Sequence, residues 1–570
     1  MAALLDWLKP RGPTVVSVPP ELAAVAPSEE WRYTQIDSPK EGQQIEGEEK
    51  GEKLEEGDVE LNDDEGDLRA FRSGTYALGR IYLNPFLPQN AGITLSFINV
   101  GVASYFLYAP VSFYLINYLD ASSAQFSAFS TLATLPWSLK FVFGVVSDTY
   151  PIFGYKRKSW LFIGWVLYMA FMCRTAFQVH HSILGITMVF FLSTCCFLLS
   201  DVCTDTLCVE RSRAFEPRYK RGSLQTSGYT SRAFGSIIGA TLGAVLYNTT
   251  EWGWGLSINH LFLLAGILPL FPLLPSLVSL VEIRTVRGED GDGDGGVKIL
   301  PRGSAPPSSA SSLGDQFASL WTTLQLEAVY MPLGFICILY ILQVPNASWT
   351  NFLVVGLRFS DYEVGIIGVA GCVFQWLGMV VFHLFFFRTP WRRVFLFTTA
   401  VNIFFSLLQI LLILRVNQKM GIPDIVFALG DTAAVQFTLA VQSMPSSIIF
   451  VMLCPEGAEG VTYALLTTVG NMAWTLAQDL GTSLTSLFDC SNSALASGDY
   501  SGVLKLTILT SIIQILPILF LRMLPANKAR HEALIRKRVS SRLGGAALVA
   551  VLVLGLGISL LLNVYYIHNS

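Results

Sequence analysis

The sequence has few charged residues. Lysine, arginine, aspartate and glutamate together make up 14% of its 570 residues, whereas a soluble globular domain carries about 25%. A soluble multidomain enzyme is therefore excluded. The chain also lacks a basic patch set among soluble helices or strands, so we expect no nucleic-acid partner.

The nine cysteines lack the spacing of a metal site or of a disulfide framework. Four of them, Cys195, Cys196, Cys203 and Cys208, lie in one apolar stretch, where packing accounts for them. We therefore expect no metal and no cofactor.

Negative charge is concentrated near one end of the chain. Residues 41–67 hold thirteen acidic residues and two lysines. The whole chain has a net charge of −4, so the remaining residues are net basic. Such an acidic segment cannot bury enough apolar surface to fold. We expect residues 1–86 to form a disordered cytosolic tail.

Long apolar stretches make up most of the remaining sequence. A membrane-spanning helix needs about 20 mainly apolar residues. Twelve such stretches occur at 92–118, 124–146, 159–178, 183–206, 224–247, 258–281, 331–355, 362–387, 393–415, 424–453, 461–486 and 500–523. Backbone groups inside lipid must pair within the segment, so these stretches predict helices. The fold class is an all-α polytopic membrane protein.

The polar segments divide the chain into parts. Residues 90–282 and 328–525 each hold six apolar stretches, and residues 283–327, with a Gly-Asp repeat and a Pro/Ser run, form a flexible cytosolic linker between them. A basic cytosolic segment, 526–543, precedes a thirteenth apolar stretch at 544–564. That stretch has no charge and no polar face, which favours a span over an interfacial helix.

The charge of the loops predicts the orientation. If the N-terminus lies inside, the inner loops hold fifteen lysines and arginines, and the outer loops hold little besides Arg358, Arg415 and Lys419. The positive-inside rule therefore places the N-terminus in the cytosol. We expect an integral multi-pass protein of the plasma membrane or an organelle membrane.

Two six-helix halves joined by a cytosolic linker resemble the major facilitator superfamily, whose substrates bind between the halves. The loop after the second stretch supports this resemblance. It reads Gly144-Val-Val-Ser-Asp148 and, after three extra residues, Gly154-Tyr-Lys156-Arg157-Lys158. We expect these glycines and charged residues at the membrane edge to lock and unlock a cytosolic gate.

Longer motifs identify a narrower resemblance. They are Pro136-Trp-Ser-Leu-Lys140, Asp201-x-x-x-Asp205-x-Leu-x-Val-Glu-Arg211, Arg232 with Gly235-x-x-x-Gly239, Gly421-Ile-Pro-Asp424, Met444-Pro445 and Cys454-Pro-Glu-Gly-Ala-Glu-Gly460. In this order they resemble the folate–biopterin transporter family over about residues 90–525. The resemblance implies a monomeric carrier that moves folate, biopterin or a related pteridine by alternating access, coupled to protons or another ion.

Four ionisable residues lie inside apolar stretches: Lys140, Asp201, Asp205 and Arg232. Charges within membrane helices cost several kcal/mol, about 2.5–3.5 on insertion scales, and mark functional sites. A rise of about 1.5 Å per residue places them at overlapping depths in the first half. Two interpretations stay open. The four form a neutral network that holds the helices together, or they bind the carboxylates and ring nitrogens of a substrate.

Three amide side chains also fall near mid-membrane: Asn99, Gln375 and Asn471. Each can hydrogen-bond a substrate or join neighbouring helices, and we favour the second role for any one of them.

Rival functions remain. One is a carrier of another small solute, such as S-adenosylmethionine, a nucleoside or a sugar. Another is an intramembrane enzyme related to prenyltransferases, which need two Asp-rich motifs, and no second one lies in an apolar stretch. A third is a sensor on the same fold that does not transport.

Overall fold

The computed structural model describes residues 90–280 and 313–569, except for 151, 154, 156, 217–221, 248–253, 388, 455–458 and 527. Its regular elements there are helices, apart from two isolated bridges, which confirms the predicted all-α class. The acidic tail expected at 1–86 and the first part of the expected linker lie outside the described residues.

The first half contains ten helical segments. They are α5 (Ala91–Tyr105), α6 (Tyr108–Asn117), α7 (Ser123–Thr134), η1 (Leu135–Leu139), α8 (Lys140–Thr149), α9 (Lys158–Ala176), α10 (Ile183–Phe215), α11 (Ser223–Leu246), α12 (Ile258–Ile267) and α13 (Leu270–Ser279). Proline interrupts two of the predicted spans. Pro136 lies in the 3₁₀ turn η1, and Pro269 caps α13, because proline lacks the N–H that a continuous helix needs.

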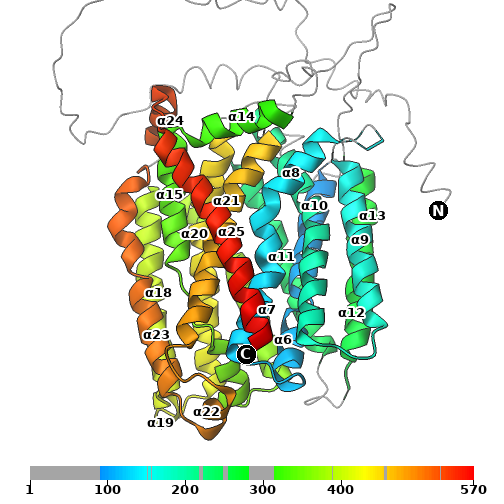
Figure 1. The fold of residues 1–570 in the computed structure, drawn as a ribbon, viewed down its shortest axis with the longest axis vertical. Coiled ribbons are helices and arrows are strands. Elements are labelled where there is room, and N and C mark those ends of the chain that lie inside the picture. Colours follow the sequence, from blue (N-terminus) through cyan, green and yellow to red (C-terminus); the bar gives the residue numbers. More distant parts are fainter. Residues whose placement is uncertain are drawn as a thin grey trace, which may run out of the picture. The chain divides into compact units, whose positions relative to one another are not determined.

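The second half is built in the same way. It comprises α15 (Glu327–Ile341), α16 (Trp349–Asn351), η3 (Phe352–Gly356), α17 (Asp361–Val381), η4 (Phe382–Phe386), α18 (Trp391–Ile413), α19 (Val416–Lys419), α20 (Asp424–Leu453), α21 (Glu459–Thr485), α22 (Asn492–Ser497), α23 (Ser501–Ile513) and η5 (Leu516–Met523). In Figure 1 these green-to-orange helices lie beside the blue-to-teal helices of the first half.

Three further helices flank the halves. The end of the expected flexible linker forms α14 (Leu313–Leu324), whose Leu320 and Leu324 are buried. The basic segment forms α24 (Lys528–Lys537), and the thirteenth apolar stretch forms α25 (Arg542–Asn569). Figure 1 shows α25, in red, crossing obliquely over α21 and α7, and it packs on both.

Ten helices among the described residues are long and apolar enough to cross a membrane, and α25 is one of them. The predicted stretches 224–247 and 461–486 form α11 and α21, which do not reach that hydropathy. Their sequences are rich in serine, threonine and glycine. Both helices pack against the opposite half, α11 on α17 and α21 on α7 and α8, so their polar side chains face protein.

Glycines allow α5 and α11 to approach closely. A Cβ atom added to Gly235 or Gly239 would overlap the backbone carbonyls of Ile98 or Val102. Gly101 of α5 faces the backbone of α11 in the same way. This contact fixes α11, and with it Arg232, against the first helix of the bundle.

Candidate functional site

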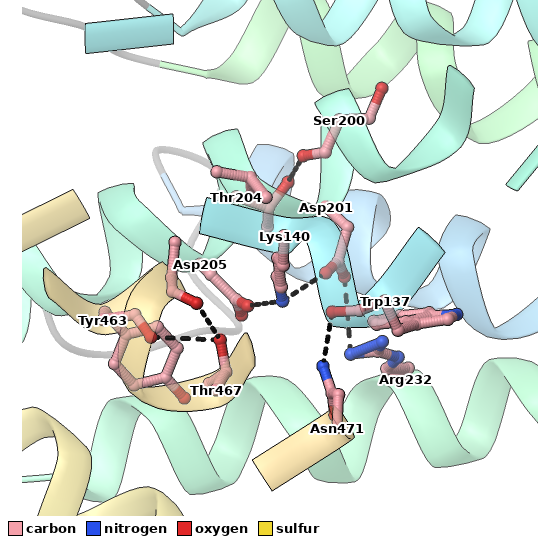
Figure 2. A network of polar contacts seen from close by, with 12 residues as sticks. Trp137, Lys140, Ser200, Asp201, Thr204, Asp205, Arg232, Tyr463, Thr467 and Asn471 are labelled. Atoms are coloured by element: carbon pink, nitrogen blue, oxygen red, sulfur yellow. Dashed lines mark hydrogen bonds and ion pairs between the residues drawn. The ribbon is translucent and has the colours of Figure 1, made fainter. Parts of the chain in front are cut away.

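Four ionisable side chains meet inside the first half. Lys140 is the first residue of α8, and Arg232 lies in α11. Lys140 Nζ lies 2.6 Å from Asp201 Oδ2 and also pairs with Asp205. Arg232 Nη1 lies 3.3 Å from Asp201 Oδ1, as Figure 2 shows. The structure thus brings together the four residues predicted at this depth, which we call the charged cluster.

The charged cluster is balanced and almost fully buried. Two acids face two bases, which matters because an unpaired charge in this environment would be strongly destabilising. The side chains of Lys140 and Asp201 are 2% and 0% exposed, whereas that of Arg232 is 20% exposed. Arg232 is therefore the member of the charged cluster that reaches accessible space.

Uncharged side chains complete the hydrogen bonding of the cluster. Gln225 Nε2 donates to Asp205 Oδ1 at 2.8 Å. The hydroxyl groups of Tyr229 and Tyr463 lie 2.7 Å apart. Tyr463 belongs to α21, so this bond joins the cluster's surroundings to the second half.

Trp137 forms a platform for both cations of the cluster. The Arg232 guanidinium carbon lies 4.6 Å from the centre of the Trp137 ring, and Lys140 Nζ lies 5.3 Å from it. Arg232 is also 5.6 Å from the Tyr229 ring. These distances are those of cation–π contacts, which stabilise a desolvated cation on an aromatic face.

The break in the second span connects the two halves through backbone groups. At the junction of η1 and α8, the Phe141 N–H donates to Thr468 Oγ1 at 2.9 Å. Asn471 Nδ2 donates to the Trp137 carbonyl at 2.9 Å. Both partners belong to α21. The residues that carry the charged cluster are therefore held directly by the second half.

A cavity of about 150 Å³ opens beside the charged cluster. Helices of the first half line it, and its sixteen lining residues include six aromatic residues and five serines or threonines. The lining residues are Ala103, Ser104, Leu107, Tyr108, Val111, Phe129, Ser130, Ala133, Thr134, Trp137, Tyr168, Met172, Phe190, Ser193, Thr194 and Phe197. Trp137 thus lines this cavity and contacts both cations of the charged cluster.

Comparison with known proteins identifies the family of this chain. The BT1 family model matches residues 100–540, which is most of the chain. The chain belongs to the BT1 family. It is 27% identical over 424 residues to a folate-biopterin transporter of Synechocystis, covering 73% of this chain and 78% of the relative.

Relatives from other organisms have similar names. Folate transporter 1 of Plasmodium falciparum is 24% identical, over 72% of this chain and 74% of its own length. Probable folate-biopterin transporter 2 of Arabidopsis thaliana is 22% identical, over 76% and 82%. The BT1 family is therefore one of membrane transporters, and this BT1 protein is a transporter rather than an intramembrane enzyme.

The three amides predicted near mid-membrane have different positions in this BT1 protein. Asn471 contacts the Trp137 carbonyl and so lies next to the charged cluster. Asn99 donates to the Pro269 carbonyl at 3.0 Å and joins α5 to the start of α13. Gln375 hydrogen-bonds Tyr105. Among the described residues, Asn99 and Gln375 do not line the cavity, so their contacts are those of residues that join helices.

The predicted gate is organised around Arg157. This buried side chain pairs with Asp148, donates to Ser147 Oγ at 2.8 Å and lies 3.1 Å from Glu210 Oε1. Ser147 and Asp148 lie in the last turn of α8, and Glu210 lies near the end of α10. The loop and two helix ends are thus tied together at one end of the first half.

Two other predicted gate residues lie in the part of the chain that the structure describes. Gly144 is buried in α8, and Lys158 Nζ lies 5.9 Å from the Tyr155 ring. Gly154 and Lys156 lie outside the described residues.

Sequence reasoning missed the aromatic part of the site. Trp137 lies three residues before Lys140, and Tyr229 lies three residues before Arg232. An aromatic residue three positions from an intramembrane cation shares a helix face with it. This spacing in the sequence could therefore have predicted both cation–π pairs.

Proposed function

We propose that this BT1 protein transports folate, biopterin or a related pteridine by alternating access of a site formed by the cavity and the charged cluster. The observation that carries the proposal is the position of Arg232. Its side chain is partly exposed, and its guanidinium lies on the ring of Trp137, which also lines the cavity.

The lining of the cavity suits a flat heteroaromatic ring. Trp137, Tyr168 and Phe197 offer aromatic faces, and Ser193 and Thr194 offer hydroxyl groups. Aromatic walls with a few placed polar groups are typical of small-molecule sites. A cavity of this size holds about one benzene-sized ring, so a pteridine requires the first-half helices that line the cavity to move apart.

Arg232 supplies the charge recognition. A guanidinium pairs with a carboxylate or a ring carbonyl through two parallel N–H groups. In the structure Asp201 holds this guanidinium at 3.3 Å. A substrate carboxylate that binds Arg232 would compete with Asp201 for it, and the tail of a folate has such a carboxylate.

Competition between the substrate and Asp201 for Arg232 can couple transport to a proton. When an anionic group of the substrate engages Arg232, Asp201 and Asp205 are left with Lys140 as their only cation within the cluster. Two buried carboxylates near one base favour the uptake of a proton. We therefore propose that substrate and proton enter the charged cluster together.

The orientation follows from the loop charges. The basic residues that flank the spans favour a cytosolic N-terminus, which places the Arg157 network at the cytosolic edge. There it closes the inner side of the first half. We propose the plasma membrane or an organelle membrane as the location.

The proposal is tested by uptake of labelled folate and biopterin into cells that require them. Arg232→Gln removes the guanidinium but keeps a polar side chain of similar length. We expect uptake to be lost while the variant reaches the membrane in normal amounts. Arg232→Lys retains the charge without the paired N–H groups, so we expect a raised KM with part of the rate preserved.

Arg415→Gln serves as the matched control. Arg415 also forms an ion pair, with Asp424 at 2.8 Å, but its side chain is 33% exposed and lies outside the site. Its uptake should equal that of the unmodified protein. Normal uptake by Arg232→Gln would refute the assigned site, and uptake of a nucleoside or sugar instead of a pteridine would refute the substrate class.

A further inference from the structure

A second buried acid lies away from the charged cluster, under the C-terminal helix. Asp479 of α21 is 3% exposed, and Asn563 of α25 is 0% exposed. Asn563 Nδ2 donates to Asp479 Oδ1 at 2.5 Å and to the Ser559 carbonyl at 2.8 Å. The contact joins two helices that are distant in sequence.

The hydrogen bonding of this pair is incomplete if Asp479 is ionised. The Ser559 side chain also hydrogen-bonds Asp479. Asp479 Oδ2 and Asn563 Oδ1 are nevertheless both buried without a hydrogen-bond partner among the residues that the structure describes. A carboxylate has no hydrogen to donate, so it cannot satisfy the amide oxygen. A neutral carboxylic acid has one, and its O–H can donate to Asn563 Oδ1 while the amide donates back.

The surroundings of Asp479 offer no compensating charge. Helix α7 and the turn η1 carry no titratable side chain. The other helices that contact α21 carry Lys140, Asp201, Asp205, Asp431 and Lys505, and none of these charges acts on Asp479. Two tyrosines also lie along α21. Tyr566 of α25 donates to Ser483 at 3.5 Å, and Tyr340 of α15 contacts the ring of Trp474. No lysine, arginine or histidine among the described residues acts on Asp479. A lone buried carboxylate is strongly disfavoured and takes up a proton instead.

We propose that Asp479 and Asn563 form a proton-binding site, in which a neutral carboxylic acid and an amide are joined by two parallel hydrogen bonds and fasten α25 to α21. The proton satisfies both orphan oxygen atoms at once. Its loss would leave a carboxylate facing the amide oxygen, so α25 would be held less firmly.

The proton site acts on both halves because α25 also packs on the first half. Ile567 of α25 lies in one apolar cluster with Ala128 and Leu132 of α7. A proton at Asp479 therefore stabilises a helix that lies across the line where α7 and α21 meet. This inference does not depend on the identity of the transported solute.

The test compares the full-length protein with three variants at neutral and alkaline pH. Asp479→Asn gives an amide–amide pair with the same two hydrogen bonds and no titration. The double exchange Asp479→Asn with Asn563→Asp restores an acid and an amide in swapped positions. Asp489→Asn, at an exposed residue, is the matched control for loss of one carboxyl group.

We expect the melting temperature of the unmodified protein to fall by a few degrees as the pH becomes alkaline. The fall should persist in the double exchange and in Asp489→Asn and be absent in Asp479→Asn. A spin label at Leu561, which is 76% exposed, should become more mobile under the same alkaline conditions, with Cys173 and Cys195 replaced by alanine beforehand.

Infrared spectroscopy at neutral pH gives an independent readout. The difference between the unmodified protein and Asp479→Asn should contain the C=O band of a protonated carboxyl group. Carboxylate bands in that difference, or the same alkaline loss of stability in Asp479→Asn, would overturn the proposal. Neither measurement involves uptake, so the outcome is separate from that of the proposed function.

Discussion

Asp201 and Asp205, buried in the first half, have a cationic partner, whereas Asp431, buried in the second half, has an amide partner. Asp201 and Asp205 both pair with Lys140, whereas Gln409 donates to Asp431 at 2.8 Å. An acid paired with a cation keeps its charge in the membrane, and a buried acid without a nearby cation is more stable when neutral. The first half therefore holds fixed charge for a substrate to meet, and the second half supplies uncharged polar contacts.

The largest effect should come from breaking a charge pair in the first half. Lys140→Ala leaves two buried carboxylates with Arg232 as their only cationic partner in the cluster. Removing one partner of a buried pair costs about 3–5 kcal/mol. We expect a large fall in the melting temperature of the purified protein and loss of uptake.

A second substitution separates charge balance from transport. Adding Asp205→Asn to Lys140→Ala restores one acid and one base, Asp201 with Arg232. Much of the lost stability should return, while uptake stays low because Lys140 is absent. If the double variant were as unstable as Lys140→Ala, cavity formation rather than charge would explain the loss.

His531, a buried base outside the spans, extends the comparison of buried ionisable residues. Neither of its ring nitrogens has a hydrogen-bond partner among the described residues. His531 of α24 is 0% exposed, with its ring 6.0 Å from that of Trp391. Burial lowers the pKa of His531 to about 4 from its ordinary 6.5. The neutral form is the one that packs, so α24 is held most firmly above pH 6.5. This stability is lost as the pH falls toward about 4, by at most about 3 kcal/mol.

His531→Phe keeps the aromatic contact and removes the titration. We expect its melting temperature to vary less between neutral and mildly acidic pH than that of the unmodified protein. His180→Phe changes an exposed histidine and should leave the acid sensitivity as it was. Equal acid sensitivity in His531→Phe would exclude this histidine as the cause.

The smallest effect should come from the second half. Asp431→Asn replaces an acid that has no cationic partner by an amide of the same shape, so we expect a change in stability within about 1 kcal/mol. Asp201→Asn is the same chemical change made beside Lys140 and Arg232, and it should cost several times more. Similar melting temperatures for the two variants would contradict the distinction between the halves.

The sequence was sufficient to predict the helical class and the charged cluster. A charge in an apolar stretch is conspicuous, and the spacing of Asp201 and Asp205 places them on one helix face. Depth along each helix then places Lys140 and Arg232 beside them. Spacing on a helix face and depth along a helix can both be counted directly from the sequence.

The remaining features depend on contacts between distant segments. The partners of Asp431 and Asp479 lie 22 and 84 residues away, and no periodicity connects them. The cavity is formed by small, aliphatic, hydroxyl and aromatic residues of α5, α6, α7, η1, α9 and α10, which singly resemble core or lipid-facing residues. The helix at 313–324 was missed because a Pro/Ser run precedes it.

The 3₁₀ turn at Pro136 gives the backbone groups of Trp137 and Phe141 two alternative sets of hydrogen-bond partners. In a continuous α-helix the Phe141 N–H would bond to the Trp137 carbonyl, four residues earlier. Here the Phe141 N–H bonds to Thr468 across the interface, and the Trp137 carbonyl accepts from Asn471 as well as from the Lys140 N–H of the 3₁₀ turn. If the halves part, the N–H and the carbonyl can bond to each other, and the helix straightens. Separation then leaves no orphaned main-chain group in the membrane, which keeps the barrier to rocking low.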